Sequence, residues 1–372
     1  MDIFSYNVDG DHLELDGVCE EWFEILWTRR FFKGDGFTIT IPPTARNIAL
    51  FSVGKVIELA KTNPLTGASE HSGIITDVSI SSGERPVLTV SGKSADGLLE
   101  RRIFSELGDS IIEVLRKNAG DLARANRRFG AVHFDVDSNV DIKYLKNMRW
   151  KTLSELVSYA GEQVGWGLQT YIDHSAAPYM VIFGRVYADH SVSQSENKRV
   201  IFSDEYENAT DFEKMHTETG AVSAVVVGAN AKYSNVSLID IAEVLDYFDN
   251  GASGFGRVEK FQAANVVTKG EVRGEATWTV LDSLETYAES QKLADAAYVP
   301  ATDFFGAKVI IKDDWETKFN IGDIVTVQNT EWNMTANKQV SEIQEYWGAD
   351  NVTVTATLGV PSKTLTEILK KG

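Results

Sequence analysis

The segment from Trp22 to Pro42 constrains the fold most, because it has the pattern of an amphipathic β-hairpin. Its first arm is rich in aromatic and aliphatic residues and ends with the doublet Arg29-Arg30. The two glycines of Gly34-Asp35-Gly36 allow the positive φ values of a tight turn. Residues 37–41 then form a second arm that is apolar at every second position, as in a strand with one buried face. We therefore expect a hairpin with one apolar and one polar face.

Strand and turn signals continue on both sides of this hairpin, from Phe4 to Val90. Short alternating or apolar runs are separated by turn clusters such as Asn63-Pro64-Leu65-Thr66-Gly67. Short strands at this spacing are typical of a small barrel or sandwich. The sequence thus predicts an N-terminal β-barrel domain over residues 1–102.

The hydrophobic period changes after residue 102. Ser110 and Glu113 have the spacing of a capping box, and Thr152 with Glu155 repeats it, so two helices are expected to start there. Strands are expected at 168–172 and 179–183. Residues 103–189 are therefore predicted to form an α+β domain.

The second half of the chain is harder to divide. Residues 190–198 are polar and aperiodic, as in a linker. Residues 190–302 are interpreted as a smaller unit of strands and a helix with a loop-rich insertion, including an expected helix over 282–297 and an ambiguous stretch over 238–248. Residues 303–372 return to short strands and end in a predicted helix over 364–371. The expected fold class is α+β and β-rich, with two small β-barrels flanking an α+β domain and a smaller fourth unit.

The balance of charges limits the partners. The 372 residues carry 54 acidic and 36 basic side chains, a formal net charge of −18. Specific nucleic-acid binding is not expected, because it depends on Lys and Arg neutralising phosphates. No segment reaches the ~18 apolar residues of a membrane span, and the N-terminus lacks a signal-peptide pattern. We expect a soluble protein made in the cytoplasm, with its single Cys19 a buried small hydrophobe.

The sequence contains only incomplete versions of known metal-binding and phosphate-binding motifs. Residues 135–141 begin like a calcium loop, but Val140 stands where the turn needs glycine and Lys146 where a bidentate glutamate belongs. The glycines of 251–256 have the wrong spacing for a phosphate loop. The six histidines lack metal-binding spacing, and no nucleophile elbow occurs. The sequence therefore predicts no catalytic, cofactor or metal site, and no enzyme.

Two arginine doublets, Arg29-Arg30 and Arg101-Arg102, stand out in this acidic chain. Both lie at expected barrel ends. They either occupy the surface or pair with acidic residues across a subunit interface, where guanidinium groups bind carboxylates in bidentate fashion. We interpret all four as candidate interface residues.

Three stretches together carry a resemblance to a known family. They are the hairpin itself, the segment Ser91 to Arg102 with its Leu-Leu-x-Arg-Arg ending, and the C-terminal pair of 319–327, with Gly322-Asp323-Ile324-Val325, and 353–359, with its closing Thr-x-Gly. In this order they resemble the baseplate-hub (tail-associated, Tal-like) proteins of siphophages and prophages. The resemblance covers both ends of the chain better than its middle.

The resemblance implies a structural hub at the tip of a phage or prophage-like tail. Such a hub is a homotrimeric ring of similar first and last barrels, which adapts the six-fold tail to the three-fold tip and lets DNA through an acidic lumen. Its implied partners are the distal tail protein, the tape measure protein and tip or fibre proteins. The implied location is the virion tail.

The sequence leaves two functions open besides a structural hub. One is a carbohydrate-binding receptor-recognition protein that stacks sugars on Trp315, Trp332 and Trp347, although these side chains could equally pack in the core. The other is a cell-wall hydrolase of the tail tip, since paired carboxylates meet only in three dimensions.

Overall fold

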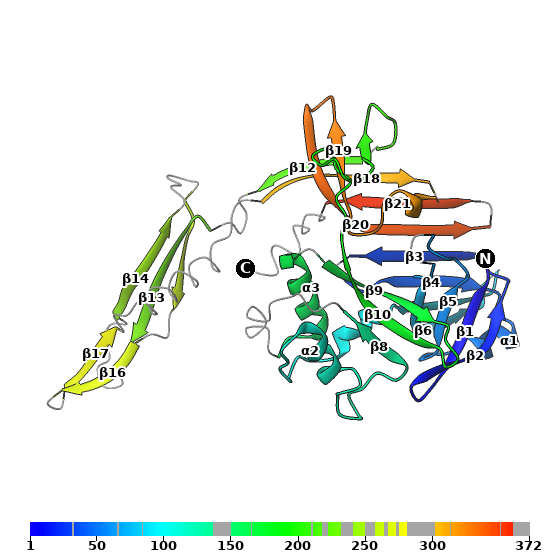
Figure 1. The fold of residues 1–372 in the computed structure, drawn as a ribbon, viewed down its shortest axis with the longest axis horizontal. Helices are drawn as coiled ribbons and strands as arrows, with labels where there is room; N and C mark the ends of the chain where they lie inside the picture. The colour runs from blue at the N-terminus through cyan, green and yellow to red at the C-terminus, as the bar shows by residue number, and fades with distance from the viewer. Residues whose placement is uncertain are drawn as a thin grey trace. The chain divides into compact units, whose positions relative to one another are not determined.

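The chain forms two compact units in the computed structural model. The first is built from Met1–Phe212 and Gly306–Pro361, and the second contains Glu213–Phe305. The described residues are 1–31, 33–64, 67–83, 85–136, 150–164, 166–209, 211–217, 222–231, 241–249, 257–263, 267–272, 275–280, 302–312, 314–349 and 351–359. Figure 1 shows the ribbon.

A 13-stranded sheet dominates the first unit (Figure 1). Its strand order is β12-β18-β21-β20-β3-β4-β7-β6-β5-β1-β2, with β19 paired to β20 and β11 paired to β19. The N-terminal members are β1 (Ile3–Asp9), β2 (His12–Cys19), β3 (Glu24–Arg30), β4 (Gly36–Ile41), β5 (Val56–Leu59), β6 (Ser72–Ser81) and β7 (Val87–Lys93). The later members are β11 (Ile201–Ser203), β12 (Asp211–Thr217), β18 (Thr302–Ile311), β19 (Ile324–Asn329), β20 (Met334–Gly348) and β21 (Val352–Leu358).

The hairpin expected from the sequence is present as β3 and β4, paired from Glu24↔Thr40 to Thr28↔Gly36. Ile25, Trp27 and Ile39 are fully buried, and for Ile39 this agrees with the alternation of residues 37–41. They belong to a core cluster that also holds the Trp347 ring of β20. The hairpin thus forms the centre of the sheet.

The two separate small barrels expected from the sequence are not confirmed, and no closed barrel is found in the described part of the chain. Instead, the N-terminal and C-terminal strands join in one sheet through antiparallel pairing of β3 with β20, from Arg30↔Glu342 to Glu24↔Gly348. The physical reason lies in the edge of β3. An edge strand presents unpaired backbone N–H and C=O groups, and here the long β20 satisfies them.

The α+β part of the first unit has its own core. A three-stranded sheet, β8 (Val132–Asp135), β10 (Tyr179–Val186) and β9 (Trp166–Asp173), packs with α2 (Ile111–Asn118) and α3 (Leu153–Val164). Both helix starts follow the prediction, since the hydroxyls of Ser110 and Thr152 accept from the backbone N–H of Glu113 and Glu155. The 3₁₀ helix η1 (Asp96–Arg101) leads from the large sheet into this part, and α1 (Ala45–Leu50) follows β4.

The second unit is described through its strands. β14 (Ile241–Asp249), β13 (Ala224–Ala231) and β15 (Glu259–Ala263) form one sheet, and β16 (Val267–Val272) pairs with β17 (Glu275–Val280). The ambiguous stretch over 238–248 is therefore largely strand. The helices expected over 282–297 and 364–371 lie outside the described residues. The four-domain division of the sequence stays a prediction.

Candidate functional site

The junction between β3 and β20 contains a buried cluster of charged side chains, here called the junction cluster. Its members are Arg29, Lys61, Glu70, His71, Glu316 and Glu345. All except Lys61 are at most 3% exposed. The strand alternation explains two of them: Arg29 follows Ile25 and Trp27 on the inward face of β3, and Glu345 lies between Ile343 and Trp347 on the inward face of β20.

Arg29 is the central cation of the junction cluster. Its Nη2 pairs with Glu70, and its Nη1 donates to Glu316 Oε1 at 3.0 Å. The guanidinium also lies 5.5 Å from the centroid of the Trp315 ring, in cation–π contact. Trp315 and Glu316 belong to the short 3₁₀ helix η5 (Trp315–Thr317). The arginine thus connects β3 to a segment near the other end of the chain.

Glu345 is the second centre of the junction cluster. Its carboxylate contacts His71 Nε2 and Lys61 Nζ, and Trp315 Nε1 donates to it at 3.4 Å. Burial by itself would raise the pKa of Glu345, but the charge and hydrogen bond of His71 and the charge of Lys61 hold it well below its usual range. This buried carboxylate is therefore ionised and paired, as a stable interior charge must be.

A pair of buried carboxyl groups, Asp35 and Asp96, lies beside the hairpin turn. The backbone N–H of Arg30 donates to Asp35 Oδ1 at 2.8 Å, and Thr170 Oγ1 donates to Asp96 Oδ1 at 2.9 Å. Burial and the charge of Asp96 raise the pKa of Asp35 to about 8, and burial raises the pKa of Asp96 to about 6. Two neighbouring buried carboxyls do not easily ionise together, so this pair titrates as a unit.

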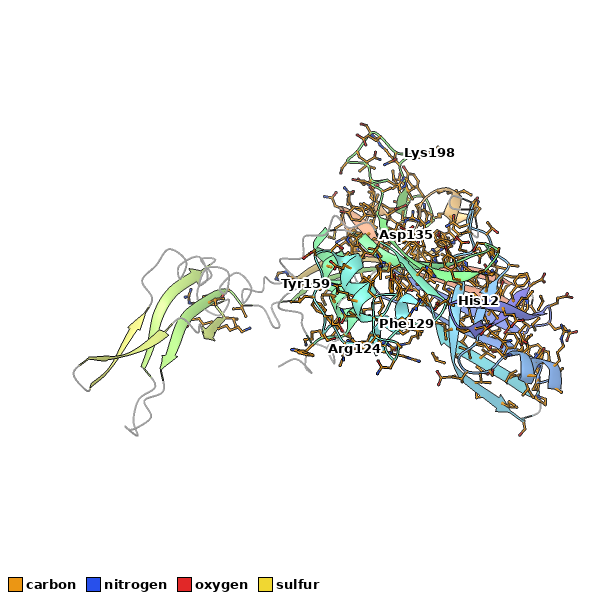
Figure 2. The ribbon with its side chains drawn as sticks, turned by 60° about the horizontal axis from the view of Figure 1, so that its bottom comes forward. His12, Arg124, Phe129, Asp135, Tyr159 and Lys198 are labelled. Atoms are coloured by element: carbon orange, nitrogen blue, oxygen red, sulfur yellow. The ribbon has the colours of Figure 1, made fainter. Side chains whose placement is uncertain are left out.

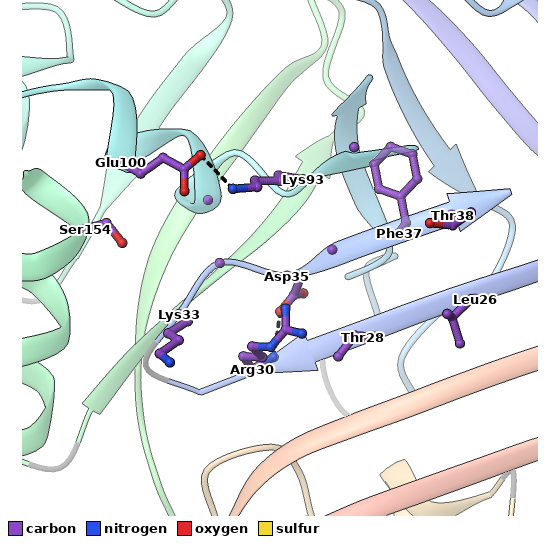
Figure 3. A pocket seen from close by; sticks show the side chains of 14 residues that line it. Leu26, Thr28, Arg30, Lys33, Asp35, Phe37, Thr38, Lys93, Glu100 and Ser154 are labelled. Carbon is purple, nitrogen blue, oxygen red and sulfur yellow. Dashed lines mark hydrogen bonds and ion pairs between the residues drawn. The ribbon is translucent and has the colours of Figure 1, made fainter. Parts of the chain in front are cut away.

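An open groove of about 520 Å³ lies between this turn and η1 (Figure 3). Arg30, Lys33 and Lys93 line it together with acidic and hydroxyl groups, and Lys93 Nζ forms an ion pair with Glu100 at 2.6 Å. The groove is thus lined by both basic and acidic side chains, and one of its lysines is already paired with a glutamate. Within the described ranges, no group of His, Cys, Asp or Glu side chains could hold a metal ion.

The four arginines selected from the sequence have different surroundings. Arg29 is inside the junction cluster, and Arg30 pairs with Glu342 of β20 at 2.9 Å, both side chains being about one-third exposed. Arg101 is exposed at the end of η1. Arg102 donates to the Arg127 carbonyl at 2.7 Å and lies 4.3 Å from the ring centroid of Phe129, which is labelled in Figure 2. Their role at a subunit interface stays a prediction.

The remaining sequence candidates are placed as follows. Cys19 is buried, as expected, and burial raises its pKa. Residues 137–149 and 251–256 lie outside the described part of the chain, so the calcium-loop and glycine-loop interpretations stay open. Trp315 and Trp347 are buried, whereas Trp332 is 45% exposed. Among the described residues, no helix is long and apolar enough to cross a membrane.

Sequence reasoning missed the acidic members of the junction cluster. Glu345 was detectable, because it occupies an inward position between two apolar residues of an alternating strand. Glu70 and Glu316 gave no such signal, since both lie outside the regular strands.

Comparisons with known proteins agree with this architecture. The sequence model of a family described as Siphovirus ReqiPepy6 Gp37-like protein matches residues 3–360. The solved 43 kDa tail protein of prophage MuSo2 from Shewanella oneidensis superposes with a TM-score of 0.52 at 12% identity, covering 97% of this chain and 99% of that one. No curated protein gave a significant sequence match.

Two further solved structures share the fold. A tail protein from Neisseria meningitidis MC58 has a TM-score of 0.50 at 16% identity, with 97% of each chain covered. A chain of the p2 virion baseplate in its activated conformation has a TM-score of 0.50 at 11% identity, covering 97% of this chain and all of that one. At these identities the similarity concerns the fold.

Proposed function

Because this chain belongs to the Siphovirus ReqiPepy6 Gp37-like protein family, we propose that it is a structural protein of a phage or prophage-like tail, located at the baseplate. The observation that carries the proposal is the extent of the similarity. The family match spans residues 3–360, and the solved tail proteins from Shewanella oneidensis prophage MuSo2 and Neisseria meningitidis share the fold over 97% of the chain. A fold alone does not define a function. Here the family match and the fold both point to structural proteins of phage tails.

The arrangement of charges in the interior supports a structural role. The inward-facing charged groups at the junction of β3 and β20 are engaged in ion pairs with one another. A catalytic acid or base must instead be able to reach a substrate. We expect no lytic activity, so zymography on peptidoglycan should show no cleared band. A cleared band that survives purification would favour the hydrolase alternative.

The finer proposal is a hub. Three copies form a closed ring that adapts a six-fold tail to a three-fold tip, with the distal tail protein, the tape measure protein and tip or fibre proteins as neighbours. The net charge of −18 permits a lumen lined by Asp and Glu, through which DNA passes without binding, but it does not place these acids on the inner wall. The predicted interface arginines belong to this proposal.

Imaging and a binding assay test the hub together. Negative-stain electron microscopy of the purified protein at high concentration should show three-fold rings with a central hole. In a gel assay at low salt, where electrostatic attraction is strongest, the protein should not retard DNA. Retardation at low salt would contradict the conduit role, and the absence of rings, both alone and with a tail partner, would contradict the hub.

A further inference from the structure

A hollow of about 440 Å³ lies at one end of the β11–β19 pair. It is formed by the chain following β11 and by the tight turn between β19 and β20. The residues that line it are Asp204, Glu207, Ala209, Phe212, Asn329, Glu331 and Trp332. This volume is within the range of small-molecule binding sites.

An aromatic surface forms one side of the hollow. Trp332 is 45% exposed, and the Phe212 ring lies edge-on to it, with 6.3 Å between centroids and an interplanar angle of 67°. Among the tryptophans whose side chains the structure describes, only Trp150 is more exposed. An indole that is half-exposed and supported by a second ring is suited to stacking on a ligand.

Hydrogen bonds fix the turn that presents this indole. The backbone N–H of Trp332 donates to Asn329 Oδ1 at 2.7 Å. Thr330 donates from its backbone N–H and from its Oγ1 to the carboxylate of Asp204, at 3.0 and 2.8 Å. The two sides of the hollow, 126 positions apart in the sequence, are thus bonded to each other. The hollow is therefore formed before any ligand arrives.

A buried amide lines the hollow. Asn329 is only 5% exposed, and its Oδ1 is used by the Trp332 N–H. No hydrogen bond among the described residues uses its Nδ2, and this atom is not one of the fully buried, unpaired side-chain atoms, so it is a donor that reaches the open space of the hollow. A ligand that offers a hydrogen-bond acceptor would satisfy it.

The charges of the lining restrict the ligand further. Asp204, Glu207 and Glu331 contribute three carboxylates, and none of the described lining residues is Lys or Arg. The hydrogen bond from the Thr330 backbone lowers the pKa of Asp204 to about 2, so this group is ionised at ordinary pH. Phosphorylated, sulfated and uronic acid ligands are thereby disfavoured.

These features together select one chemical class. A simple ammonium ion would satisfy the carboxylates and the indole but offers no acceptor to Asn329 Nδ2. An uncharged sugar ring has an apolar C–H face for the indole, hydroxyl donors for the carboxylates of Glu207 and Glu331, and hydroxyl acceptors for the amide. We propose that the hollow defined by Trp332, Asn329 and Asp204 binds an uncharged pyranose. Sugar binding goes beyond the structural role and does not depend on it.

The full-length chain tests this by saturation-transfer NMR with methyl glycosides of glucose, galactose, mannose and N-acetylglucosamine. At least one should bind. Trp332→Ala should weaken binding about tenfold, because the stacking surface is lost. Asn329→Asp keeps the Oδ1 acceptor for the turn but removes the Nδ2 donor, and should also weaken binding. The matched control is Trp150→Phe, an exposed aromatic outside the hollow, which should bind like the wild type.

Three results would overturn the proposal. One is the absence of binding by all four glycosides, and another is unchanged binding by Trp332→Ala with its fold intact by circular dichroism. The third is binding of choline, but of no sugar, in a manner sensitive to Trp332, which would make the hollow an organic-cation site. A glycan array then distinguishes recognition of a single ring from recognition of a longer surface polysaccharide. Oligomeric state is measured separately, so failure here leaves the hub proposal intact.

Discussion

Arg29 of β3 and Glu316 of η5 form a buried ion pair at 3.0 Å, although 287 positions separate them in the sequence. The same guanidinium pairs with Glu70. Together with the β3–β20 pairing, these contacts connect the two ends of the chain within the first unit. The large sheet of the first unit is thus built from strands of both halves of the chain.

Removing Arg29 should therefore be costly. Arg29→Ala removes the guanidinium group that pairs with the buried carboxylates of Glu70 and Glu316, and we expect a loss of about 3–5 kcal/mol in the free energy of unfolding. Urea denaturation followed by tryptophan fluorescence measures it. The matched control is the neighbouring Arg30→Ala, whose partly exposed pair with Glu342 should contribute about 0–1 kcal/mol. Equal losses in the two variants would contradict the central role of Arg29.

Gly322 is a second position where little change is tolerated. Its φ is +89°, and an added Cβ would overlap the fully buried ring of Phe31. Gly322→Ala should cost about 2–5 kcal/mol, from backbone strain and from overpacking. Gly10→Ala, at φ +59° with open space around the added Cβ, should cost only about 1–2 kcal/mol. Thermal unfolding of both variants measures the difference between their losses of stability. Equal losses would show that the Phe31 ring moves aside to accommodate the added Cβ.

The Asp35–Asp96 pair predicts a pH dependence. Because the pKa of Asp35 is raised in the folded state, the folded protein binds more protons than the unfolded chain between about pH 4 and pH 8. The contribution of this group to stability is thus fully present at low pH and is lost as the pH rises through that window. Asp35→Asn keeps the acceptor for the Arg30 N–H and removes the ionisation. The stability of this variant relative to the wild type should therefore increase from pH 5 to pH 8.

A surface carboxylate provides the control for this pH series. Lys55 lowers the pKa of Asp16, so the contribution of Asp16 to stability is lost only when the pH falls below its usual range. Asp16→Asn should then differ from the wild type by a constant amount between pH 5 and pH 8. Parallel curves for Asp35→Asn and Asp16→Asn would show that Asp35 titrates normally.

Arg30 and Arg101 should contribute to subunit assembly if the arginine doublets lie at an interface. If these exposed or partly exposed guanidinium groups pair with carboxylates of a second subunit, Arg30→Ala and Arg101→Ala should weaken assembly by roughly 2–5 kcal/mol while the monomer stays folded. Sedimentation of each variant over a concentration series measures the shift. Assembly like that of the wild type in both variants would place these arginines outside the interface.

Local patterns in the sequence were informative where neighbours along the chain decide the structure. The alternation of residues 37–41 predicted the inward face of β4, and the Ser110 and Thr152 capping boxes predicted both helix starts. The resemblance to siphophage and prophage tail proteins, based on three ordered motifs, is confirmed by the family match.

Long-range relationships could not be predicted in this way. The sequence marks Arg29 as a candidate interface residue because its doublet stands out in an acidic chain and lies at an expected barrel end. Its partners Glu70 and Glu316 lie 41 and 287 positions away, where no periodicity reveals them. The pairing of β3 with β20 was missed for the same reason, since the register of two distant strands depends on tertiary packing.

The most direct test of the hub proposal is the mass of the native particle, by sedimentation velocity of the wild-type protein alone over a wide concentration range and again with its tail partner. The account predicts a species of three times the 41.1 kDa chain mass in at least one of the two conditions. A particle that remains at the mass of a single chain in both would contradict it.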